Sequence, residues 1–237
     1  MFTGIVSSIA TIQRIDDRGG IRTFELEFVD DFCKDLTIGA SVAVDGVCLT
    51  VTHRISETRA SFDVVLPSIQ ITTLGSEQVG SLVNVERAAK DGAEIGGHPL
   101  SGHIDAQAPI VLIEAIDNNY RLRFGLPESL SSYVFAKGYI AINGASLTVS
   151  AVDHQDQWFE VWLIPETRRQ TTLGAKLVGD RVNIEIDRGT QVVVDTIKAS
   201  VTETLGPLLP QFEQFLAAQG SSLNALTHTT AHPLQRS

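Results

Sequence analysis

An internal duplication constrains this chain more than any other feature of its sequence. Residues 42–51 (Val-Ala-Val-Asp-Gly-Val-Cys-Leu-Thr-Val) recur as residues 140–149 (Ile-Ala-Ile-Asn-Gly-Ala-Ser-Leu-Thr-Val). In each copy an Asp-Gly or Asn-Gly pair separates two β-rich runs, which is the signature of a tight hairpin. The match continues on both sides: residues 2–6 match 100–104, residues 72–75 match 171–174, and residues 83–86 match 182–185. Copies of this length are expected to be two domains rather than units of a solenoid.

Each copy has the pattern of a small barrel. Turn residues at Gly19-Gly20, Gly39, Asp45-Gly46 and Gly80 separate β-rich segments in the first copy. We expect strands at residues 2–10, 22–28, 41–44, 48–52, 61–66 and 82–87, and short helical turns at 30–36 and 67–74. The sequence therefore predicts an all-β fold of two tandem, similar, six-stranded antiparallel Greek-key barrels. The predicted barrel domains are residues 1–98 and 99–190.

The periodicity changes after Asp187. Apolar residues then recur every three or four positions, which predicts a C-terminal α-helical segment over residues 191–219, interrupted near Gly206-Pro207 and Pro210. The apolar stripe consists of Val193, Ile197, Val201, Leu205, Leu208, Phe212 and Phe215. This face either packs on its own barrel or forms a subunit contact. Residues 220–237 predict a flexible tail, in which His228 and His232 are expected to be solvated.

The composition of the chain excludes several classes of binding partner. The chain has 237 residues and a formal net charge of −10, which argues against a nucleic-acid surface. The N-terminus lacks a signal-peptide pattern and polar residues interrupt every apolar run, so we expect no membrane segment and a cytoplasmic location. Two cysteines, Cys33 and Cys48, are too few for a disulfide framework or a four-thiolate metal site. A small molecule remains as the expected ligand.

The second strand of each repeated hairpin carries polar side chains on one face. Because side chains alternate across a strand, Cys48 and Thr50 are expected to face away from the core, as are Ser146 and Thr148 in the second copy. The predicted core residues of these strands are Val47, Leu49 and Val51 in the first copy and Ala145, Leu147 and Val149 in the second. Cys48 thus occupies the position of Ser146. As a lone cysteine on a strand, Cys48 is by default a buried structural thiol.

The joint between the copies places His98 and His103 among Gly96, Gly97 and Gly102. Three interpretations remain open: a metal site, a turn-forming linker with surface histidines, or a site in which the histidines bind a ligand or move protons. A metal site would need further ligands, for which only Cys48 and scattered carboxylates are at hand. The sequence has no P-loop, dinucleotide-binding glycine pattern, serine elbow or His-Glu-x-x-His motif.

Together these motifs resemble the riboflavin synthase alpha-chain family, whose members carry lumazine-binding repeats. The resemblance rests on the N-terminal Met-Phe-Thr-Gly-Ile-Val, the Cys-Leu-Thr-Val and Ser-Leu-Thr-Val strands, and residues 94–98, 101–103, 164–167, 171–174 and 182–187. It implies an enzyme that dismutates two molecules of 6,7-dimethyl-8-ribityllumazine, moving a four-carbon unit to give riboflavin and 5-amino-6-(D-ribitylamino)uracil. It implies no metal and no cofactor.

The resemblance also implies a homotrimer. The active site would lie between the N-terminal barrel of one subunit and the C-terminal barrel of a neighbour, and the C-terminal helices would gather the trimer. Residues 191–219 would then form the subunit contact. Association with other riboflavin-pathway enzymes is left open.

Site residues follow from the same resemblance in two matching sets. The N-terminal barrel would use Gly4, Ile5, Val6, Cys48, Leu49, Thr50, Asp63, Leu66 and Ser68. The C-terminal barrel would use Gly102, His103, Ile104, Ser146, Leu147, Thr148, Leu163, Ile164, Pro165, Glu166 and Thr167, with Lys137 reaching the ribityl chain or the ring. His98 and Asp187 complete the predicted substrate-binding set.

The catalytic candidates are Cys48, His103, Ser146, Phe2 and Ser41. His103 is the candidate for proton transfer, while Cys48, Ser146 or a bound water would supply the nucleophile. Ser41, His98, Glu166 and Asp187 would orient or support the reacting groups. The two copies differ at Cys48 against Ser146, at Phe2 against Leu100 and at Ile5 against His103, so two identical substrates would meet unlike sites.

One departure from the family pattern lies in the first copy. Leu66-Pro67-Ser68 stands where a Lys-Glu-Thr or Pro-Glu-Thr block is usual, so the N-terminal pocket is expected to bind more weakly or differently. This keeps open an alternative function, a non-catalytic lumazine- or flavin-binding paralogue resembling the lumazine proteins. A structural trimer without a ligand is a third class, but it leaves the repeated polar strand faces without a purpose. Retention of His98, His103, Cys48, Ser146 and Lys137 favours the enzyme.

Overall fold

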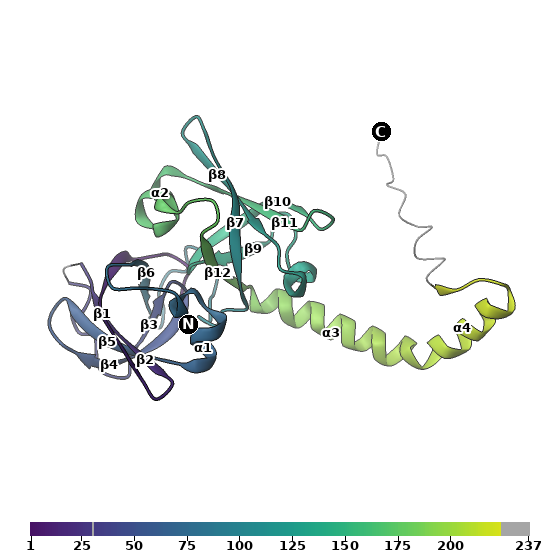
Figure 1. Cartoon of the computed structure of the whole chain (residues 1–237), viewed down its shortest axis with the longest axis horizontal. Coiled ribbons are helices and arrows are strands. Elements are labelled where there is room, and N and C mark those ends of the chain that lie inside the picture. The colour runs from purple at the N-terminus through teal and green to yellow at the C-terminus, as the bar shows by residue number, and fades with distance from the viewer. Residues whose placement is uncertain (30, 224–237) are drawn as a thin grey trace. The chain divides into compact units, whose positions relative to one another are not determined.

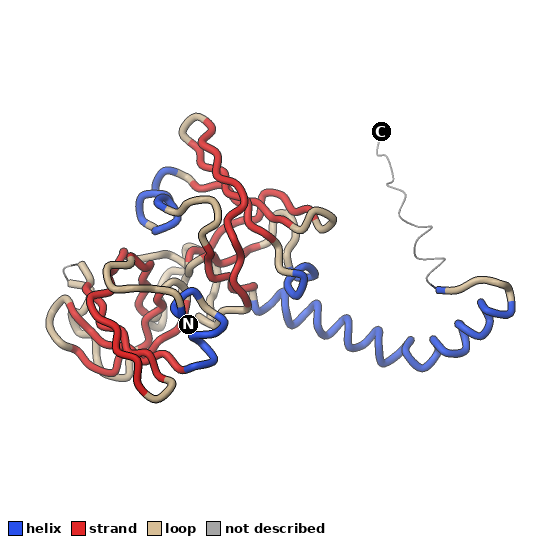
Figure 2. The backbone as a smooth tube through the Cα atoms, viewed as in Figure 1, coloured by secondary structure: helices blue, strands red, loops and turns tan. Residues whose placement is uncertain are grey.

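The computed structural model describes residues 1–29 and 31–223, which form two closed six-stranded barrels followed by helices (Figures 1 and 2). The first barrel consists of β1 (Ser8–Arg18), β2 (Ile21–Glu27), β3 (Ser41–Val44), β4 (Val47–Arg54), β5 (Arg59–Val65) and β6 (Leu82–Arg87). The second consists of β7 (Ala106–Ile116), β8 (Asn119–Gly125), β9 (Tyr139–Ile142), β10 (Ala145–Asp153), β11 (Trp158–Leu163) and β12 (Arg181–Ile186).

Both barrels have the same topology. Their neighbouring strands are antiparallel, in the circular order β1-β2-β5-β4-β3-β6 in the first and β7-β8-β11-β10-β9-β12 in the second. Each barrel encloses its own apolar core, with Phe24 and Phe62 inside the first and Phe124 and Phe159 inside the second. The predicted class of two tandem antiparallel barrels is confirmed.

The predicted alternation along the repeated hairpins is also confirmed. The side chains of Val47, Leu49, Val51, Ala145, Leu147 and Val149 are buried. Cys48 and Ser146 are half-buried on the opposite face of their strands, and Thr50 and Thr148 are exposed. The polar face of each hairpin is therefore available to a ligand.

The first strand differs from its prediction. β1 begins at Ser8 instead of residue 2 and continues to Arg18. Gly4 has a φ of +76°, a left-handed conformation that an extended strand does not contain. Residues 2–6 therefore lie outside the strand, whereas Ser7 N–H still donates to the carbonyl of Val85 on β6 (2.9 Å). Phe2 forms an isolated bridge with Leu100. The predicted strand start is wrong because the sequence pattern does not reveal this left-handed glycine.

Short helices connect the last strands of each barrel. α1 (Leu66–Ile71) and the 3₁₀ helix η1 (Thr73–Gly75) confirm the helical turns predicted near residues 67–74, and α2 (Pro165–Gln170) and η3 (Thr172–Ala175) repeat them. A proline lies in the first turn of α1 and of α2, where its missing N–H is tolerated. The helical turn predicted at 30–36 is not formed over residues 31–35, which make simple turns; residue 30 lies outside the described residues. The matching connection in the second copy is the 3₁₀ helix η2 (Glu128–Tyr133).

The described part of the chain divides into two units, with the boundary between Gln191 and Val192. After the second barrel follow α3 (Arg188–Leu205), η4 (Gly206–Leu208) and α4 (Leu209–Ala218), which confirms the predicted helix and its interruption at Gly206-Pro207. The apolar stripe is exposed within the second unit: Val193, Ile197, Val201, Leu205, Leu208, Phe212 and Phe215. Most of the predicted tail, including His228 and His232, lies outside the described residues. Within the described part of the chain, no helix is both long and apolar enough to span a membrane.

A buried polar network joins the two barrels and follows the duplication. Asn84 Nδ2 donates to the carbonyl of Asn143 (2.9 Å), and Asn183 Nδ2 donates to the carbonyl of Asp45 (2.9 Å). The amide oxygens of the same two asparagines accept backbone N–H groups from η3 and η1 of the opposite barrels. Because buried polar groups without partners are costly, the network favours a single pairing of the two barrels.

Asp45 breaks the symmetry of this network. Its Oδ1 accepts the Asn84 N–H (2.8 Å), just as Asn143 Oδ1 accepts the Asn183 N–H (2.7 Å). The second carboxyl oxygen of Asp45 is buried and makes no hydrogen bond to the described residues. Burial raises the pKa of Asp45 to about 7, although the bond from Asn84 opposes this. The first copy thus holds a protonatable group where the second holds a neutral amide.

We expect Asp45→Asn to stabilise the protein at pH 8 by about 2–4 kcal/mol. The folded state retains a proton on Asp45 between the ordinary value of 3.8 and about 7, so the free energy of unfolding of the parent should fall as pH rises through this window. The variant should lack this fall. Urea unfolding from pH 4 to pH 8 measures both effects, and Asp117→Asn on an exposed turn is the control. Parallel pH profiles of parent and Asp45→Asn would contradict the assignment.

Candidate functional site

The two copies exchange the segments that precede their first strands. Ser146 N–H donates to the carbonyl of Gly4 (2.8 Å), and Cys48 N–H donates to the carbonyl of Gly102 (2.8 Å). Val6 packs against the core of the second barrel, whereas Ile104 packs against that of the first. Residues 2–6 therefore line the polar strand face of the second barrel, and residues 100–104 line that of the first.

Glycine makes this exchange sterically possible. A Cβ on Gly4 would lie 2.5 Å from the Cβ of Ser146, and a Cβ on Gly102 would lie 2.5 Å from that of Cys48. Both glycines have left-handed φ angles, +76° and +78°. Gly97, in the joint, is equally confined, because a Cβ there would lie 2.9 Å from Ser146 Oγ. The glycines that the sequence placed beside the histidines thus allow backbone to approach the hairpin strands.

The predicted division of site residues between the barrels is wrong for these segments. Gly4, Ile5 and Val6 were expected beside Cys48, and Gly102, His103 and Ile104 beside Ser146. The structure pairs them the other way, because the carbonyl of Gly4 accepts the Ser146 N–H and the carbonyl of Gly102 accepts the Cys48 N–H. Spacing along the sequence assigned each segment to its own copy and contains no signal of the exchange.

A cavity of about 490 Å³ lies where the first exchanged segment meets the second barrel. It brings together seven of the predicted site residues, namely Gly4, Ile5, Val6, Ser146, Ile164, Glu166 and Thr167. Ser7, Ala145, Gln170 and Thr171 also line it. Its walls are strand β10, helix α2 and the exchanged segment, so both copies build this one cavity. Leu147 and Leu163 are buried in the core, so a ligand in this cavity would meet at most their backbone.

Ser146 and His98 form a hydrogen-bonded pair beside this cavity. Ser146 Oγ lies 2.6 Å from His98 Nδ1, and the ring of His98 stacks on Tyr139 with centroids 5.1 Å apart. His98 is only 3% exposed, and its Nε2 is buried without a partner among the described residues. Burial lowers the pKa of His98, an effect that the charge of Asp187 opposes. A neutral His98 can accept a proton from the Ser146 hydroxyl.

The corresponding surface of the first barrel carries Cys48 and His103. Cys48 is a free, half-buried cysteine on β4, and the side chain of His103 is exposed. The His103 carbonyl accepts a hydrogen bond from Arg188 Nη2 (2.6 Å), and Arg188 also pairs with Asp105 (3.1 Å). A guanidinium at the start of α3 therefore fixes the backbone of His103.

The remaining predicted residues do not line the cavity beside Ser146. Asp187 accepts the N–H and the hydroxyl of Thr190 (2.7 and 2.9 Å) and so caps α3. Lys137 is exposed, with a φ of +71°, and Asp63 accepts the Thr23 hydroxyl (2.7 Å). Ser41 begins β3, opposite Thr50. Leu66 and Ser68 lie on α1, the counterpart of α2.

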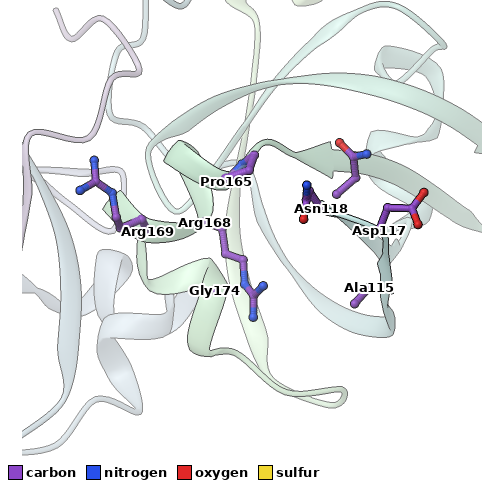
Figure 3. A pocket seen from close by; sticks show the side chains of 8 residues that line it. Ala115, Asp117, Asn118, Pro165, Arg168, Arg169 and Gly174 are labelled. Carbon is purple, nitrogen blue, oxygen red and sulfur yellow. The ribbon is translucent and has the colours of Figure 1, made fainter.

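A second cavity, of about 600 Å³, lies beside the β7–β8 turn (Figure 3). Pro165 lines this cavity together with Asp117, Asn118 and Arg168. The guanidinium of Arg168 packs over the ring of Tyr120 at 4.3 Å, and Figure 3 shows Arg169 pointing away from the turn. The cavity is wide and its charged walls are exposed, so the cavity beside Ser146 remains the candidate site.

Sequence reasoning missed several residues that shape the site. Tyr139 stacks on His98, Arg188 holds His103, and Glu86 and Glu185 bind the exchanged segments. Burial raises the pKa of Glu86, and the bonds from Thr3 and Gly4 oppose this. The repeated Val-Asn-x-Glu of residues 83–86 and 182–185 was a signal for the two carboxylates. Among the described residues, no three His, Cys, Asp or Glu side chains converge as metal ligands would.

Comparison with known proteins agrees with this architecture. The family model described as "Lumazine binding domain" matches residues 3–88 and 101–187, one match for each barrel. Two solved structures of LumP, complexed with riboflavin and with 6,7-dimethyl-8-(1'-D-ribityl) lumazine, superpose with TM-scores of 0.73 and 0.71. Each is 26% identical and covers 79% of this chain and 100% of LumP. Fold and site thus define a protein with tandem lumazine-binding domains.

Closer relatives identify the branch of that class. Riboflavin synthase of Escherichia coli (strain K12) is 48% identical over 199 residues, which cover 84% of this chain and 92% of the relative. Riboflavin synthase of Chlamydia pneumoniae is 44% identical over 198 residues, covering 84% of this chain and 96% of the relative. The chain belongs to the riboflavin synthase family.

A pair of glycine substitutions tests the close approach of the exchanged segment. Gly80→Ala meets only the strain of a positive φ, since nothing lies within 4 Å of its added Cβ; it should lower the free energy of unfolding by about 1 kcal/mol. Gly102→Ala carries the same strain plus the clash with Cys48, and should cost at least about 2 kcal/mol more. Equal losses in urea unfolding would mean that residues 100–104 do not press against β4.

Proposed function

We propose that the chain dismutates two molecules of 6,7-dimethyl-8-ribityllumazine into riboflavin and 5-amino-6-(D-ribitylamino)uracil. Identity of 48% to a riboflavin synthase over most of both chains supports this reaction. One structural observation carries the proposal further than the likeness does. The chain presents two matching strand faces, and the polar side chains on them differ: Ser146 with His98 on one, Cys48 and the exposed His103 on the other.

The duplication suits a reaction between identical molecules. Each barrel would bind one substrate by the same backbone groups, namely the strand that carries Cys48 or Ser146 and the exchanged segment beside it. One substrate donates a four-carbon unit and the other accepts it, so the two surfaces must treat their ligands differently. Holding two heterocycles face to face provides effective molarities of roughly 10⁵ M or more. Much of the catalysis would then come from binding and orientation.

Polar side chains would supply the proton transfer and the nucleophile that binding and orientation alone do not provide. The reaction removes a proton from an acidic ring methyl group and adds a nucleophile to the partner ring. His98 accepting the Ser146 proton would give a serine nucleophile, or would activate a water bound beside it. Cys48 is the alternative nucleophile on the first barrel, and the exposed His103 is the candidate for proton transfer. Lys137 would contact the ribityl chain or the ring.

Assembly would complete the active site. We propose that the surface of the first barrel in one subunit faces the surface of the second barrel in a neighbour, within a cytoplasmic homotrimer. The exposed apolar stripe of α3, with Val193, Ile197 and Val201, supplies a face that such an assembly would bury. Barrel domains at residues 1–98 and 99–190, a trimerisation segment at 191–219 and contacts with other pathway enzymes belong to the same proposal.

A lumazine- or flavin-binding paralogue without turnover is the second candidate. The fold likeness to LumP complexed with riboflavin and the unusual Leu66-Pro67-Ser68 at the start of α1 favour it. In α2 the matching block supplies Glu166 to the cavity, whereas α1 offers no carboxylate there. The pair of Ser146 and His98, which a binding protein would not need, favours the enzyme.

Turnover separates the two candidates. Purified protein incubated with 6,7-dimethyl-8-ribityllumazine alone should form one riboflavin for each two lumazines consumed, followed by absorbance and chromatography. Addition of a chelator should leave the rate unchanged, since the proposed chemistry uses only side chains. Recovery of the lumazine bound and intact after long incubation would instead select the binding paralogue.

The role of His98 can be tested against a matched pair. His98→Gln should lower kcat about 100-fold, because Ser146 loses its proton acceptor. His154 bonds the Ser131 hydroxyl (3.0 Å) on the protein surface, and His154→Gln should leave kcat unchanged. Burial lowers the pKa of His98, so the neutral, active form persists below the ordinary histidine range. Activity of the parent should therefore fall only at pH values below about 6.5, as a kcat–pH profile would show. An unchanged kcat in His98→Gln would contradict a nucleophile at Ser146 and indicate Cys48 instead.

A further inference from the structure

A buried carboxylate of the first barrel binds the first exchanged segment. Glu86, on β6, is 6% exposed. Its Oε1 accepts the N–H and the hydroxyl of Thr3 (2.6 and 2.7 Å), and its Oε2 accepts the N–H of Gly4 (3.1 Å). Both oxygens accept N–H groups, as an ionised carboxylate does. Glu86 thus fixes residues 3 and 4 on the edge of the first barrel.

The second barrel repeats the arrangement. Glu185, on β12, is 1% exposed. Its Oε1 accepts the N–H and the hydroxyl of Ser101 (2.7 and 2.6 Å), and its Oε2 accepts the N–H of Gly102 (3.0 Å). Three corresponding donors therefore bond a corresponding carboxylate in each copy.

These contacts act across the molecule. Gly4 donates its N–H to Glu86 of the first barrel, and its carbonyl accepts the N–H of Ser146 in the second barrel. Gly102 donates its N–H to Glu185 of the second barrel, and its carbonyl accepts the N–H of Cys48 in the first. Each carboxylate belongs to the sheet of one barrel and holds a segment that lines the polar face of the other.

We propose that Glu86 is a positioning residue for the ligand site of the second barrel, and Glu185 for that of the first. The inference rests on the proposed function in taking these two faces as substrate sites. It goes beyond that function in assigning each barrel a part in building the site of the other. Neither glutamate touches the substrate in this account; both act through the glycine backbone beside Ser146 and Cys48.

A carboxylate suits this task better than an amide. Hydrogen bonds to a charged acceptor are shorter and stronger than those to a neutral one. Glutamine has the same shape, but it keeps only one accepting oxygen and turns an NH₂ group toward a donor. Glu→Gln should therefore loosen the exchanged segment while leaving the volume of the packed side chain unchanged.

A purely local role makes the opposite prediction. If each glutamate only stabilised its own sheet, loss of Glu86 would disturb Cys48, which lies in the same barrel, and would leave Ser146 unaffected. The two accounts thus differ in which barrel responds. A probe that reports on each barrel separately distinguishes them.

Matched thiols provide that probe. The Ser146→Cys variant carries the introduced thiol on the second barrel and Cys48 on the first, at matching positions of the repeat. Cys33 is fully buried in the core of the first barrel, so its alkylation reports unfolding. Glu86→Gln and Glu185→Gln are each placed in this background. The full-length, ligand-free chain is treated with iodoacetamide, and peptide mass spectrometry follows the three thiols.

We expect Glu86→Gln to raise the alkylation rate of the introduced thiol at least about fivefold, with the rate at Cys48 changed less than about twofold. Glu185→Gln should give the reverse pattern. The effect of Glu185→Gln should be the smaller one, because Arg188 also holds residues 101 and 103. Equal increases at both thiols, or an increase confined to the barrel that carries the substituted glutamate, would overturn the proposal.

A second pair of variants separates local loosening of the segments from unfolding of the barrels. Thr3→Val and Ser101→Ala remove the hydroxyl that donates to each glutamate, together with the N–H groups that this hydroxyl accepts, from Ile5 in the first copy and from His103 and Arg188 in the second. Each glutamate keeps its N–H bonds and both sheets stay intact, so these variants should give the same crosswise pattern. Rates are compared with that of Cys33, which should stay unreactive. Riboflavin formation is measured on the unsubstituted chain. Failure of the crosswise pattern and failure of the proposed reaction are thus separate outcomes.

Discussion

The crossed hydrogen bonds between the barrels are the constraint on which the structure depends. Asn84 and Asn183 each bind backbone of the opposite barrel. Because a buried amide without a partner is costly, these bonds favour one pairing of the two barrels, in which both oxygens and both nitrogens of the Asn84 and Asn183 side chains are bonded. That arrangement brings the Asp45-Gly46 and Asn143-Gly144 turns into contact. It also places Gly4 against Ser146 and Gly102 against Cys48. The pairing of the two barrels therefore determines both the fold and the candidate sites.

Near-symmetry with local differences is what the proposed reaction requires of a chain that must treat two identical substrates unequally. The backbone contacts of the two faces match, since Ser146 N–H bonds the Gly4 carbonyl as Cys48 N–H bonds the Gly102 carbonyl. The side chains on these faces differ: a half-buried serine bonded to a buried histidine on one, and a half-buried thiol and an exposed histidine on the other. Arg188 adds a further difference, since it fixes His103 from the start of α3. The first residue of α3 thus holds the segment that carries His103.

Much of the fold could be predicted from the sequence because duplication, hairpin turns and alternation are local signals. They placed Val47, Leu49 and Val51 inside and Cys48 outside, as observed. The exchange of residues 2–6 could not be predicted. It depends on the left-handed Gly4 and on contacts with Ser146, distant in sequence. The Ser146–His98 bond escaped prediction for the same reason, since it needs the joint folded back over β10.

The central claim is that both copies build each ligand site. A crystal structure of the protein with riboflavin bound tests it most directly. We expect the ring system on the second barrel to contact Ser146 together with Gly4, Ile5 and Val6, and a ligand on the first barrel to contact Cys48 together with Gly102 and His103. A ring held between Cys48 and residues 4–6, within the first copy alone, would contradict the account.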